Sequence, residues 1–530
     1  MTAFNVERPS IHGGPGAWLG LPLTAALLYI LAFPPFDLGI LAALAPLPIA
    51  FLTIAPTRRL GFARALAAGL LFGTATALGV TGHWMFLAAS NFFGKPVWFS
   101  AAFTISVTFI HVGLFFAVIV VLASGLGRLA APWRVLALPS LWVACEFARS
   151  NLLYGCPWDL LGHAFYGMPR TIQATDLAGV WLLSWTSVAT CAALATAYFE
   201  RANRRTVTIA LSFAIVLPLA IIGYGQLRLN HDAAARSDGD DTLAVAIVQA
   251  NIGRHELWDK EHALSNVGHY LELSRSPELS GADLIVWPES SIPFFLGSQP
   301  DVDRRIRALA SESGAAVLAS GPRSVDTGDG RARIYNSVFF FPPDGGPPLS
   351  YDKRHLLPYL EFRPPWLGAL GYPGDAVFYM PGETTRAFNV RGWNVAPLIC
   401  LEAIFPSYAR RDVGGGADLI LNLSNDSWFG DGAGLEQHFA MTVFRAVENH
   451  VPLVRVASTG VSAAIDSSGR IVNSLPTRRQ AVRLVRVRRG PGSSSYMAWG
   501  DWFAWCCLLL AALSVAASLA GSPAQERRRR

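Results

Sequence analysis

Long apolar stretches separated by short polar turns fill the first 225 residues of the chain. About 20 consecutive apolar residues are enough for an α-helix to cross a bilayer. By this criterion we predict seven membrane spans in the N-terminal part and an eighth near the C-terminus. The predicted spans cover residues 18–33, 38–54, 62–86, 98–124, 134–150, 178–198, 206–225 and 502–521. The pattern is typical of a polytopic α-helical membrane protein.

Residues 226–500 have a different pattern, in which short apolar runs alternate with charged and turn-forming residues. Helical spacing predicts helices over 259–275 and 301–314, the second ending at Gly314. Strands are predicted over residues 243–252, 282–290, 315–321, 335–343, 393–400 and 417–426. Strands that alternate with helices indicate α/β layering. We therefore divide the chain into a membrane domain (1–225), an extramembrane α/β domain (226–500) and a last span with a basic tail (501–530).

Charge sets the orientation of these parts. Only 15% of residues are charged and 52% are hydrophobic, and the formal net charge of +6 owes much to the final "ERRRR". With eight spans, the arginine clusters at 58–64, 128–134, 201–205 and 527–530 all fall on one side of the membrane. Basic residues in short loops mark the cytoplasmic side. We therefore expect both termini in the cytoplasm and the α/β domain outside, with no need for nucleic acid to explain the basic residues.

Two further sets of charged residues have structural interpretations. The segment 478–489, "RRQAVRLVRVRR", alternates as a strand with one solvated face does, although contact with anionic lipid headgroups is an alternative because the last span follows. Glu146 and Arg149 lie three residues apart in the fifth predicted span. Residues at this spacing share a helix face, so we expect these two to pair.

Cys400 is the only cysteine among residues 226–500. A lone thiol outside the cytoplasm has no partner for a disulfide, so it either packs in the core or takes part in chemistry. Two other apolar runs end at charged residues that could act together with this thiol. These are Glu289 after "LIVWP" and Lys353 after "PLSYD". A carboxylate can take the thiol proton, and an ammonium can stabilise an oxyanion. Each residue alone is more often an ordinary structural residue, whereas the set indicates thiol-based acyl transfer.

The motifs around these residues resemble a known family. "WPES" at 287–290, "YDKRHLLPYLEF" at 351–362 and "CLEAIFP" at 400–406 are similar to the Glu–Lys–Cys signature of the nitrilase, or carbon-nitrogen hydrolase, superfamily. Together with "CPWDLLGHAF" at 156–165, they make nearly the whole chain resemble the membrane-embedded apolipoprotein N-acyltransferase family. That resemblance implies that the α/β domain is an α-β-β-α sandwich inserted between spans seven and eight.

The resemblance also implies residue roles. Cys400 would be the nucleophile, Glu289 the general base and Lys353 the cation that stabilises the oxyanion. Glu361 and Glu402 would be supporting carboxylates, the second in the family's Cys-x-Glu pattern.

Three aromatic residues, Trp258, Trp428 and Phe429, match aromatic residues near the site in the family, for which the resemblance implies contact with acyl chains, although aromatic residues are as often core residues. The chain departs from the family at Leu401, where the family often has Tyr, so a polar role there is absent.

The implied reaction transfers an acyl chain from a membrane phospholipid, through a thioester on the cysteine, to the α-amine of a diacylglyceryl-cysteine apolipoprotein. The resemblance places such a protein in the bacterial inner membrane, and we expect a monomer without metal or cofactor. One alternative is a membrane-tethered amidase with a soluble substrate, but a tether needs only one span. A second is a transporter whose outer domain binds ligand, for which a complete Glu–Lys–Cys set would be a coincidence.

Overall fold

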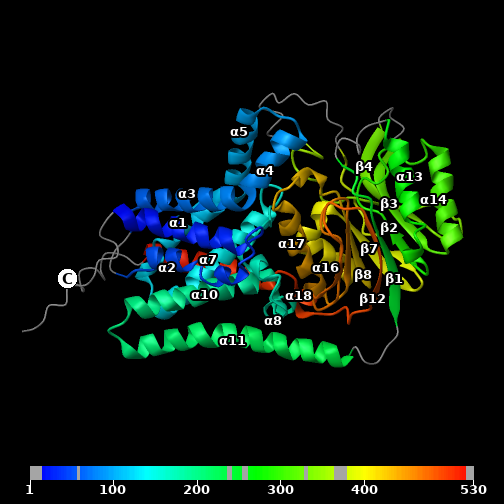
Figure 1. Cartoon of the computed structure of the whole chain (residues 1–530). Helices are drawn as coiled ribbons and strands as arrows, with labels where there is room; N and C mark the ends of the chain where they lie inside the picture. The colour runs from blue at the N-terminus through cyan, green and yellow to red at the C-terminus, as the bar shows by residue number, and fades with distance from the viewer. Residues whose placement is uncertain are drawn as a thin grey trace, which may run out of the picture.

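The computed structural model describes residues 15–56, 60–235, 241–253, 261–326, 332–362 and 379–520. Figure 1 shows two parts side by side, a bundle of helices and a domain of two sheets. The helices of the bundle come from both ends of the chain, and the sheets come from the sequence between α11 (Arg204–Ala235) and α19 (Trp502–Ala520).

Helical segments lie at all eight places where spans are predicted. Five are long and apolar enough to cross a membrane: 62–92, 97–128, 180–199, 204–232 and 502–520. The others are α1 (Pro15–Ala32), the short helices η1 (Gly39–Ala43) and α2 (Leu47–Thr53), and α7 (Ala131–Asn151). The predicted span 38–54 is thus two short helices, the second starting after Pro46. The count of eight spans stays a prediction.

The third and fourth helical segments contain π-helical turns, which commonly bend a helix. The third consists of α3 (Phe62–Ala77), the π-helix η2 (Leu78–Gly82), α4 (His83–Leu87) and η3 (Ala88–Phe92). The fourth consists of α5 (Val97–Thr108), the π-helix η4 (Phe109–Gly113) and α6 (Leu114–Ala123). In Figure 1, α5 stands across the direction of α1 and α3. The bends therefore fall where these segments approach the sheet domain.

Two expectations about polar residues in this part differ from the structure. Glu146 and Arg149 do not form an ion pair: the Glu146 carboxylate accepts hydrogen bonds from the Trp142 indole and the Leu161 amide, and the Arg149 guanidinium lies over the Phe116 ring. Helix spacing allowed the pair, but the two donors bind Oε1 of Glu146 and the Arg149 guanidinium lies over the Phe116 ring instead.

The seventh helix, α11, also continues to Ala235, beyond the predicted end of its span at residue 225. Its polar last turns are stabilised by contacts outside the helix. Arg228 lies 3.2 Å from the carboxylate of Asp176 in α9 (Thr175–Ala178), and Tyr224 donates a hydrogen bond to the same carboxylate. Apolar length alone therefore marks the bilayer segment but misses the end of the helix.

The sheet domain contains two six-stranded sheets packed face to face. The first has the strand order β12-β1-β2-β3-β4-β5 and the second β11-β10-β9-β8-β7-β6. The strands of the first are β1 (Thr242–Gln249), β2 (Leu284–Val286), β3 (Ala316–Asp326), β4 (Ala332–Phe341), β5 (Leu349–Asp352) and β12 (Ala481–Arg488). Those of the second are β6 (Phe388–Val390), β7 (Trp393–Ile399), β8 (Leu419–Ser424), β9 (Leu453–Ala457), β10 (Ala463–Ile465) and β11 (Ile471–Ser474). Apolar side chains from both sheets form one buried core between them.

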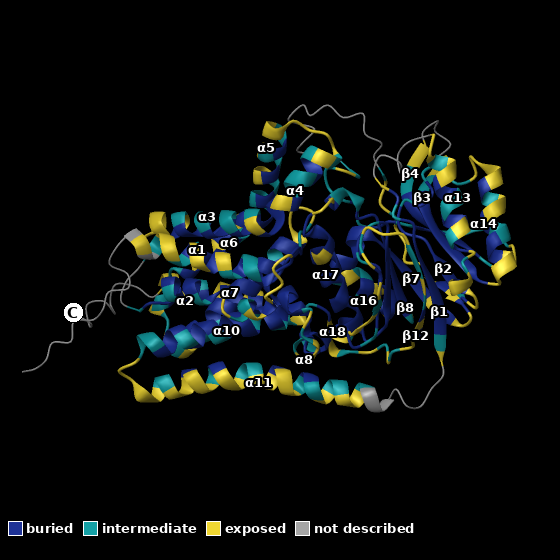
Figure 2. Cartoon of the chain, viewed as in Figure 1, coloured by how far each residue is buried: buried dark blue, intermediate teal, exposed yellow. Residues whose placement is uncertain are grey.

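Helices cover the outer face of each sheet, which gives the expected α-β-β-α order. Helices α13 (Ala263–Leu273) and α14 (Pro300–Ser313) cover the first sheet, and α16 (Pro406–Gly414) and α17 (Gly434–Asn449) cover the second. The layer of α16 and α17 lies between its sheet and the membrane helices (Figure 1). All residues of α17 except Glu436 are buried, whereas α13 and α14 have exposed outer faces (Figure 2).

Each strand and helix predicted for this domain is present as an element of the predicted type, with ends that differ by a few residues. The helix over 300–313 ends at Gly314, which has a left-handed conformation with φ of 65°. The arginine-rich segment forms β12 at the edge of the first sheet, and Arg483, Arg486 and Arg488 are exposed. Alternation of polar and apolar residues was a sufficient signal for a strand with one solvated face.

Candidate active site

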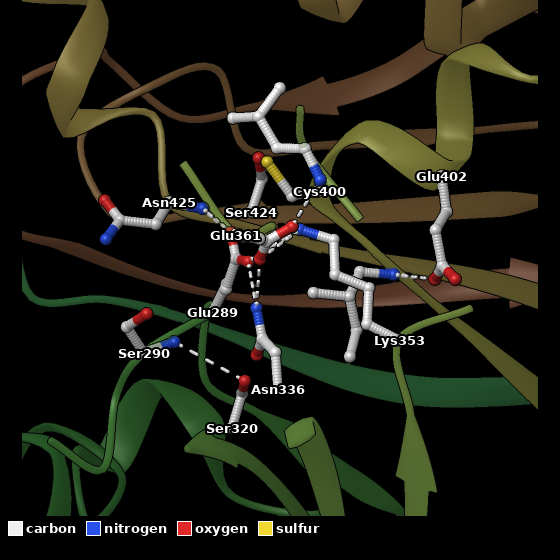
Figure 3. A network of polar contacts seen from close by, with 12 residues as sticks. Glu289, Ser290, Ser320, Asn336, Lys353, Glu361, Cys400, Glu402, Ser424 and Asn425 are labelled. Carbon is white, nitrogen blue, oxygen red and sulfur yellow. Dashed lines mark hydrogen bonds and ion pairs between the residues drawn. The ribbon is translucent and has the colours of Figure 1, made fainter. Parts of the chain in front are cut away.

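Three strands from the two sheets end at the candidate catalytic residues. Glu289 follows β2, Lys353 follows β5 directly, and Cys400 follows β7 directly. Figure 3 shows these residues gathered in one cluster with Glu361. Glu289, Lys353 and Cys400 are each at most 5% exposed. The structure thus brings together the Glu, Lys and Cys that the sequence singled out.

Lys353 lies between two carboxylates. Its Nζ donates to Glu361 Oε1 at 2.9 Å and to Glu289 Oε1 at 3.3 Å. Asn336 on β4 bridges the same two residues, because its Nδ2 is 2.9 Å from Oε1 of each. The other oxygen of Glu289 accepts from the amide of Asn425 at 2.8 Å. Both carboxylates are therefore held in place, Glu289 beside the thiol and Glu361 behind the ammonium.

Cys400 stands at a tight bend between β7 and the 3₁₀ helix η9 (Cys400–Ile404). Its φ is 50°, a conformation that is uncommon for residues with a side chain and that persists where surrounding contacts enforce it. Asn422 on β8 supplies such contacts, because its Nδ2 donates to the carbonyls of Leu398 and Cys400, each at 3.1 Å. The bend presents the sulfur at the end of the strand.

Glu402 holds the other side of this bend. Its carboxylate is fully buried and accepts hydrogen bonds from the amides of Ile399 at 2.7 Å, Arg354 at 2.6 Å and His355 at 3.2 Å. The Tyr351 hydroxyl lies 2.8 and 2.9 Å from its two oxygens. Glu402 therefore connects the segment that carries Lys353 to the segment that carries Cys400, which makes it a positioning residue.

Burial and charge determine the protonation of the site. Burial alone would lower the pKa of Lys353, but Glu289 and Glu361, with a contribution from Cys400, raise it well above the usual value. Burial and the Glu289 carboxylate raise the pKa of the Cys400 thiol, and Lys353 opposes this only in part. At neutral pH the lysine is therefore charged and the thiol keeps its proton, so attack by the sulfur requires a base.

A second buried polar network lies behind the thiol. The Ser424 hydroxyl, beside the sulfur in Figure 3, donates to Asp426 at 2.7 Å. Arg455, which is fully buried, donates to Asp426 at 2.8 Å and also to the Asn422 side-chain oxygen. Burial would raise the pKa of Asp426, but Arg455 and His438 hold it well below its usual value. The network fixes the side-chain amide of Asn422, and with it the bend at Cys400.

Aromatic side chains line the junction between the site and the membrane helices. Trp428 and Phe429 stack with ring centroids 3.9 Å apart, and Trp84 of α4 and Trp158 pack on Phe429 at 5.0 and 5.7 Å. Leu401 belongs to the same apolar cluster. Phe429 is fully buried and Trp428 only partly, so Trp428 has the surface to contact a substrate. Trp258 lies outside the described residues.

Sequence reasoning missed the amides that organise the site. Asn336 and Asn422 each stand inside an apolar strand, and Asn425 contributes through its backbone. A polar residue inside a buried strand is itself a signal, since burial without a partner is costly. Applied to "YNSVFFF", "LILNLS" and "LVRVA", this criterion would have found Asn336, Asn422 and Arg455.

A cysteine beside a base and a cation can form a covalent acyl intermediate. The carboxylate of Glu289 can remove the thiol proton, and the ammonium of Lys353 can stabilise negative charge on a carbonyl oxygen. Among the described residues, no group of three or more His, Cys, Asp or Glu side chains could hold a metal. The arrangement of Glu289, Lys353 and Cys400 therefore suits attack by the thiol on the carbonyl carbon of an acyl group.

Comparisons with known proteins agree with the motifs in the sequence. Residues 25–193 match the apolipoprotein N-acyltransferase N-terminal domain, and residues 244–490 match carbon-nitrogen hydrolase. The apolipoprotein N-acyltransferase of Geobacter metallireducens is 34% identical over 512 residues, which are 94% of this chain and 94% of that protein. That of Brucella melitensis is 34% identical over 411 residues, 75% of this chain and 74% of that protein.

A comparison with solved structures gives matches that cover about half of this chain. A CN-hydrolase superfamily protein from Xanthomonas campestris covers 50% of this chain and 96% of its own, with 23% identity and a TM-score of 0.36.

Proposed function

Since the chain belongs to the apolipoprotein N-acyltransferase family, we propose that it moves an acyl chain from a membrane phospholipid, through a thioester on Cys400, to the α-amine of a diacylglyceryl-cysteine lipoprotein. The observation that carries this proposal is the position of the thiol. Cys400 is next to a base and a cation, and the apolar cluster beside it continues into the membrane helices through Trp84 and Trp158. A lipid substrate would approach such a thiol along this apolar surface.

In the first half-reaction, Glu289 takes the proton of Cys400 while the sulfur attacks the ester carbonyl of the phospholipid. The Lys353 ammonium stabilises the resulting oxyanion. The tetrahedral intermediate collapses as Glu289 returns the proton to the departing alkoxide, which leaves a thioester and a lysophospholipid. Glu361 and Asn336 hold the ammonium and the base at the distances given above.

In the second half-reaction, the lipoprotein amine attacks the thioester carbonyl and Glu289 takes the amine proton. The thiolate leaves and recovers that proton from Glu289, which restores the enzyme and yields an amide. Two half-reactions through one covalent intermediate give ping-pong kinetics. We further propose that one copy of the chain carries out both half-reactions.

The orientation of the protein is also part of the proposal. Arg134 pairs with Glu200 beside the turn between α10 (Val180–Phe199) and α11, and Arg128 bonds to Ser518 near the end of α19. Figure 1 shows that turn at the end of the bundle away from the sheets. The positive-inside rule then assigns this end to the cytoplasm and the sheet domain to the outer side of the bacterial inner membrane.

Intact-mass analysis tests the reaction. The purified protein incubated with phosphatidylethanolamine should become heavier by one acyl chain at Cys400, whereas Cys400→Ala should not. A diacylglyceryl lipopeptide with a free α-amine should then remove the adduct and gain the acyl chain. Rapid loss of the adduct to water alone, at the same rate with and without the lipopeptide, would favour the membrane-tethered amidase, for which water is the second acceptor.

A further inference from the structure

Gln437 lies on α17, where the sheet domain meets the membrane helices. It is 1% exposed, and its side-chain amide forms four hydrogen bonds. Its Oε1 accepts from the indoles of Trp84 at 2.9 Å and Trp158 at 3.0 Å. Its Nε2 donates to the carbonyls of Pro34 at 2.9 Å and Val80 at 3.0 Å. A glutamine amide has two donor hydrogens and two acceptor lone pairs, so all of its capacity is used.

All four partners belong to the membrane part of the chain and come from three separate regions. Pro34 follows α1, Val80 and Trp84 belong to η2 and α4, and Trp158 follows α7. One side chain of the sheet domain thus fixes the relative positions of these regions. Buried groups left without such a partner would be costly, which makes the arrangement rigid.

The two indoles that Gln437 orients lie against the aromatic pair beside the site. Both pack on Phe429, which stacks under Trp428. There is little free space around them: a methyl group added at Gly432 would lie 2.5 Å from the Trp84 Cβ. We call Trp84, Trp158, Trp428 and Phe429 the aromatic wall.

The aromatic wall is joined to the catalytic groups by short stretches of chain. Phe429 follows Asn425 in the same loop, and the amide of Asn425 binds the base Glu289. Leu401, in the same apolar cluster as the wall, follows Cys400 directly. A displacement of the indoles would therefore change the surface beside the thiol, while the Asn425 amide still holds the base in place.

We propose that Gln437 is a positioning residue that holds the aromatic wall in place for the acyl chain of the donor, so that the ester carbonyl of a long-chain lipid comes to Cys400 in a reactive position. This inference rests on the proposed function. It assigns Gln437 no contact with the reacting atoms. Its effect should depend on the length of the acyl chain, because a short acyl group does not extend along the wall.

The test compares two acyl donors. Gln437→Met keeps the length of the side chain but removes all four hydrogen bonds. Acyl-enzyme formation at Cys400 is measured by intact mass with a long-chain phosphatidylethanolamine in detergent micelles and with the soluble ester p-nitrophenyl acetate. We expect the rate with the phospholipid to fall about 10- to 100-fold, as for a displaced reactant. The rate with the short ester should fall less than about threefold, since the thiol and its base are intact.

Gln249→Met is the matched control. Gln249 is equally buried and donates to the carbonyls of Pro476 and Arg479, each at 2.8 Å, but these contacts lie within the sheet domain. If this variant loses activity because it is less stable, its rates of acylation by the phospholipid and by the short ester should fall in parallel. If Gln437→Met does not fold, Trp158→Phe removes one indole donor and keeps a ring, and the same selective loss is expected.

The outcomes separate this inference from the proposed function. A parallel fall of both rates in Gln437→Met or Trp158→Phe, or an unchanged rate with the phospholipid, would overturn the role of Gln437. A wild-type protein that forms no adduct with any phospholipid would overturn the proposed function itself.

Discussion

The substitution Glu402→Gln offers a sharp test of how the bend at Cys400 is held. It keeps the shape of a fully buried side chain and replaces one acceptor oxygen with an NH₂ group. If the remaining oxygen faces Arg354 and His355, the new NH₂ group faces the amide of Ile399, which then has no acceptor. The Tyr351 hydroxyl can rotate to accept from the new group.

The cost follows from the hydrogen bonds. Bonds to a charged acceptor contribute about 1.5–3 kcal/mol and neutral ones about 0.5–1.5 kcal/mol, so the two retained amide bonds lose about 1 kcal/mol each. The unpaired Ile399 amide costs about 1–3 kcal/mol more. We therefore expect a loss of about 3–5 kcal/mol of folding free energy. Because Ile399 precedes the nucleophile, a shift of about 1 Å there should slow acyl-enzyme formation about 100-fold.

Two measurements check this expectation. The midpoint of thermal unfolding in detergent reports the loss of stability, and intact mass after incubation with phospholipid reports the rate of acylation. Glu448→Gln is the matched control, because Glu448 is also fully buried and accepts from Arg445 at 2.9 Å, near the C-terminal end of α17 instead of at the bend. The control should lose stability with little change in acylation. Acylation of Glu402→Gln at the rate of the control would refute the positioning role of Glu402.

Three further predictions concern the ammonium, a buried histidine and the orientation. Lys353→Ala should slow acyl-enzyme formation about 100- to 1,000-fold, as loss of an oxyanion donor does elsewhere, and a rate within threefold of wild type in the mass assay would contradict its role. Burial and the nearby Lys353 lower the pKa of His355 to about 4. As the pH falls, the histidine of the unfolded chain therefore binds a proton before that of the folded chain. The midpoint of thermal unfolding should fall as the pH drops from about 6.5 towards 4, and it should fall less steeply in His355→Gln. The same dependence of the midpoint on pH in both proteins would exclude this histidine as the cause. Asp344 lies at an exposed turn of the sheet domain. Asp344→Cys, in a background without native cysteines, should react with a membrane-impermeant maleimide in cells whose outer envelope is permeable. Labelling only after lysis would place the sheet domain in the cytoplasm.

The grouping of Glu289, Lys353 and Cys400 could be predicted from the sequence because strand ends and motifs are local signals, and their catalytic roles stay a prediction. Each of Cys400, Glu289 and Lys353 stands at the end of an apolar run, and the residues next to each form a recognisable motif. Asn336 and Asn422 act on partners far away in the chain, such as Glu289 for the first and Leu398 for the second. Such pairs form only when the sheets pack, so the periodicity of the sequence does not predict which residues these side chains contact.

Errors in the membrane part have the same origin. Spacing on a helix face predicted that Glu146 would pair with Arg149, but Oε1 of Glu146 accepts from Trp142 and Leu161 instead. Apolar length ended the seventh helix early, because the contact between Arg228 and Asp176 that supports its last turns joins distant segments. Local rules state which partners are allowed, and tertiary packing selects among them.

The burial of α17 on all sides has a practical consequence for protein engineering. The buried residues of α17, which include polar ones such as Gln437, His438 and Arg445, need a neighbouring element to cover them. Residues 226–500 produced alone would expose the side of α17 that contacts Trp84 and Trp158, and would leave the amide of Gln437 without its partners. The sheet domain is therefore not a detachable soluble enzyme, and attempts to graft it onto another membrane anchor should carry the first, third and fifth helical segments with it.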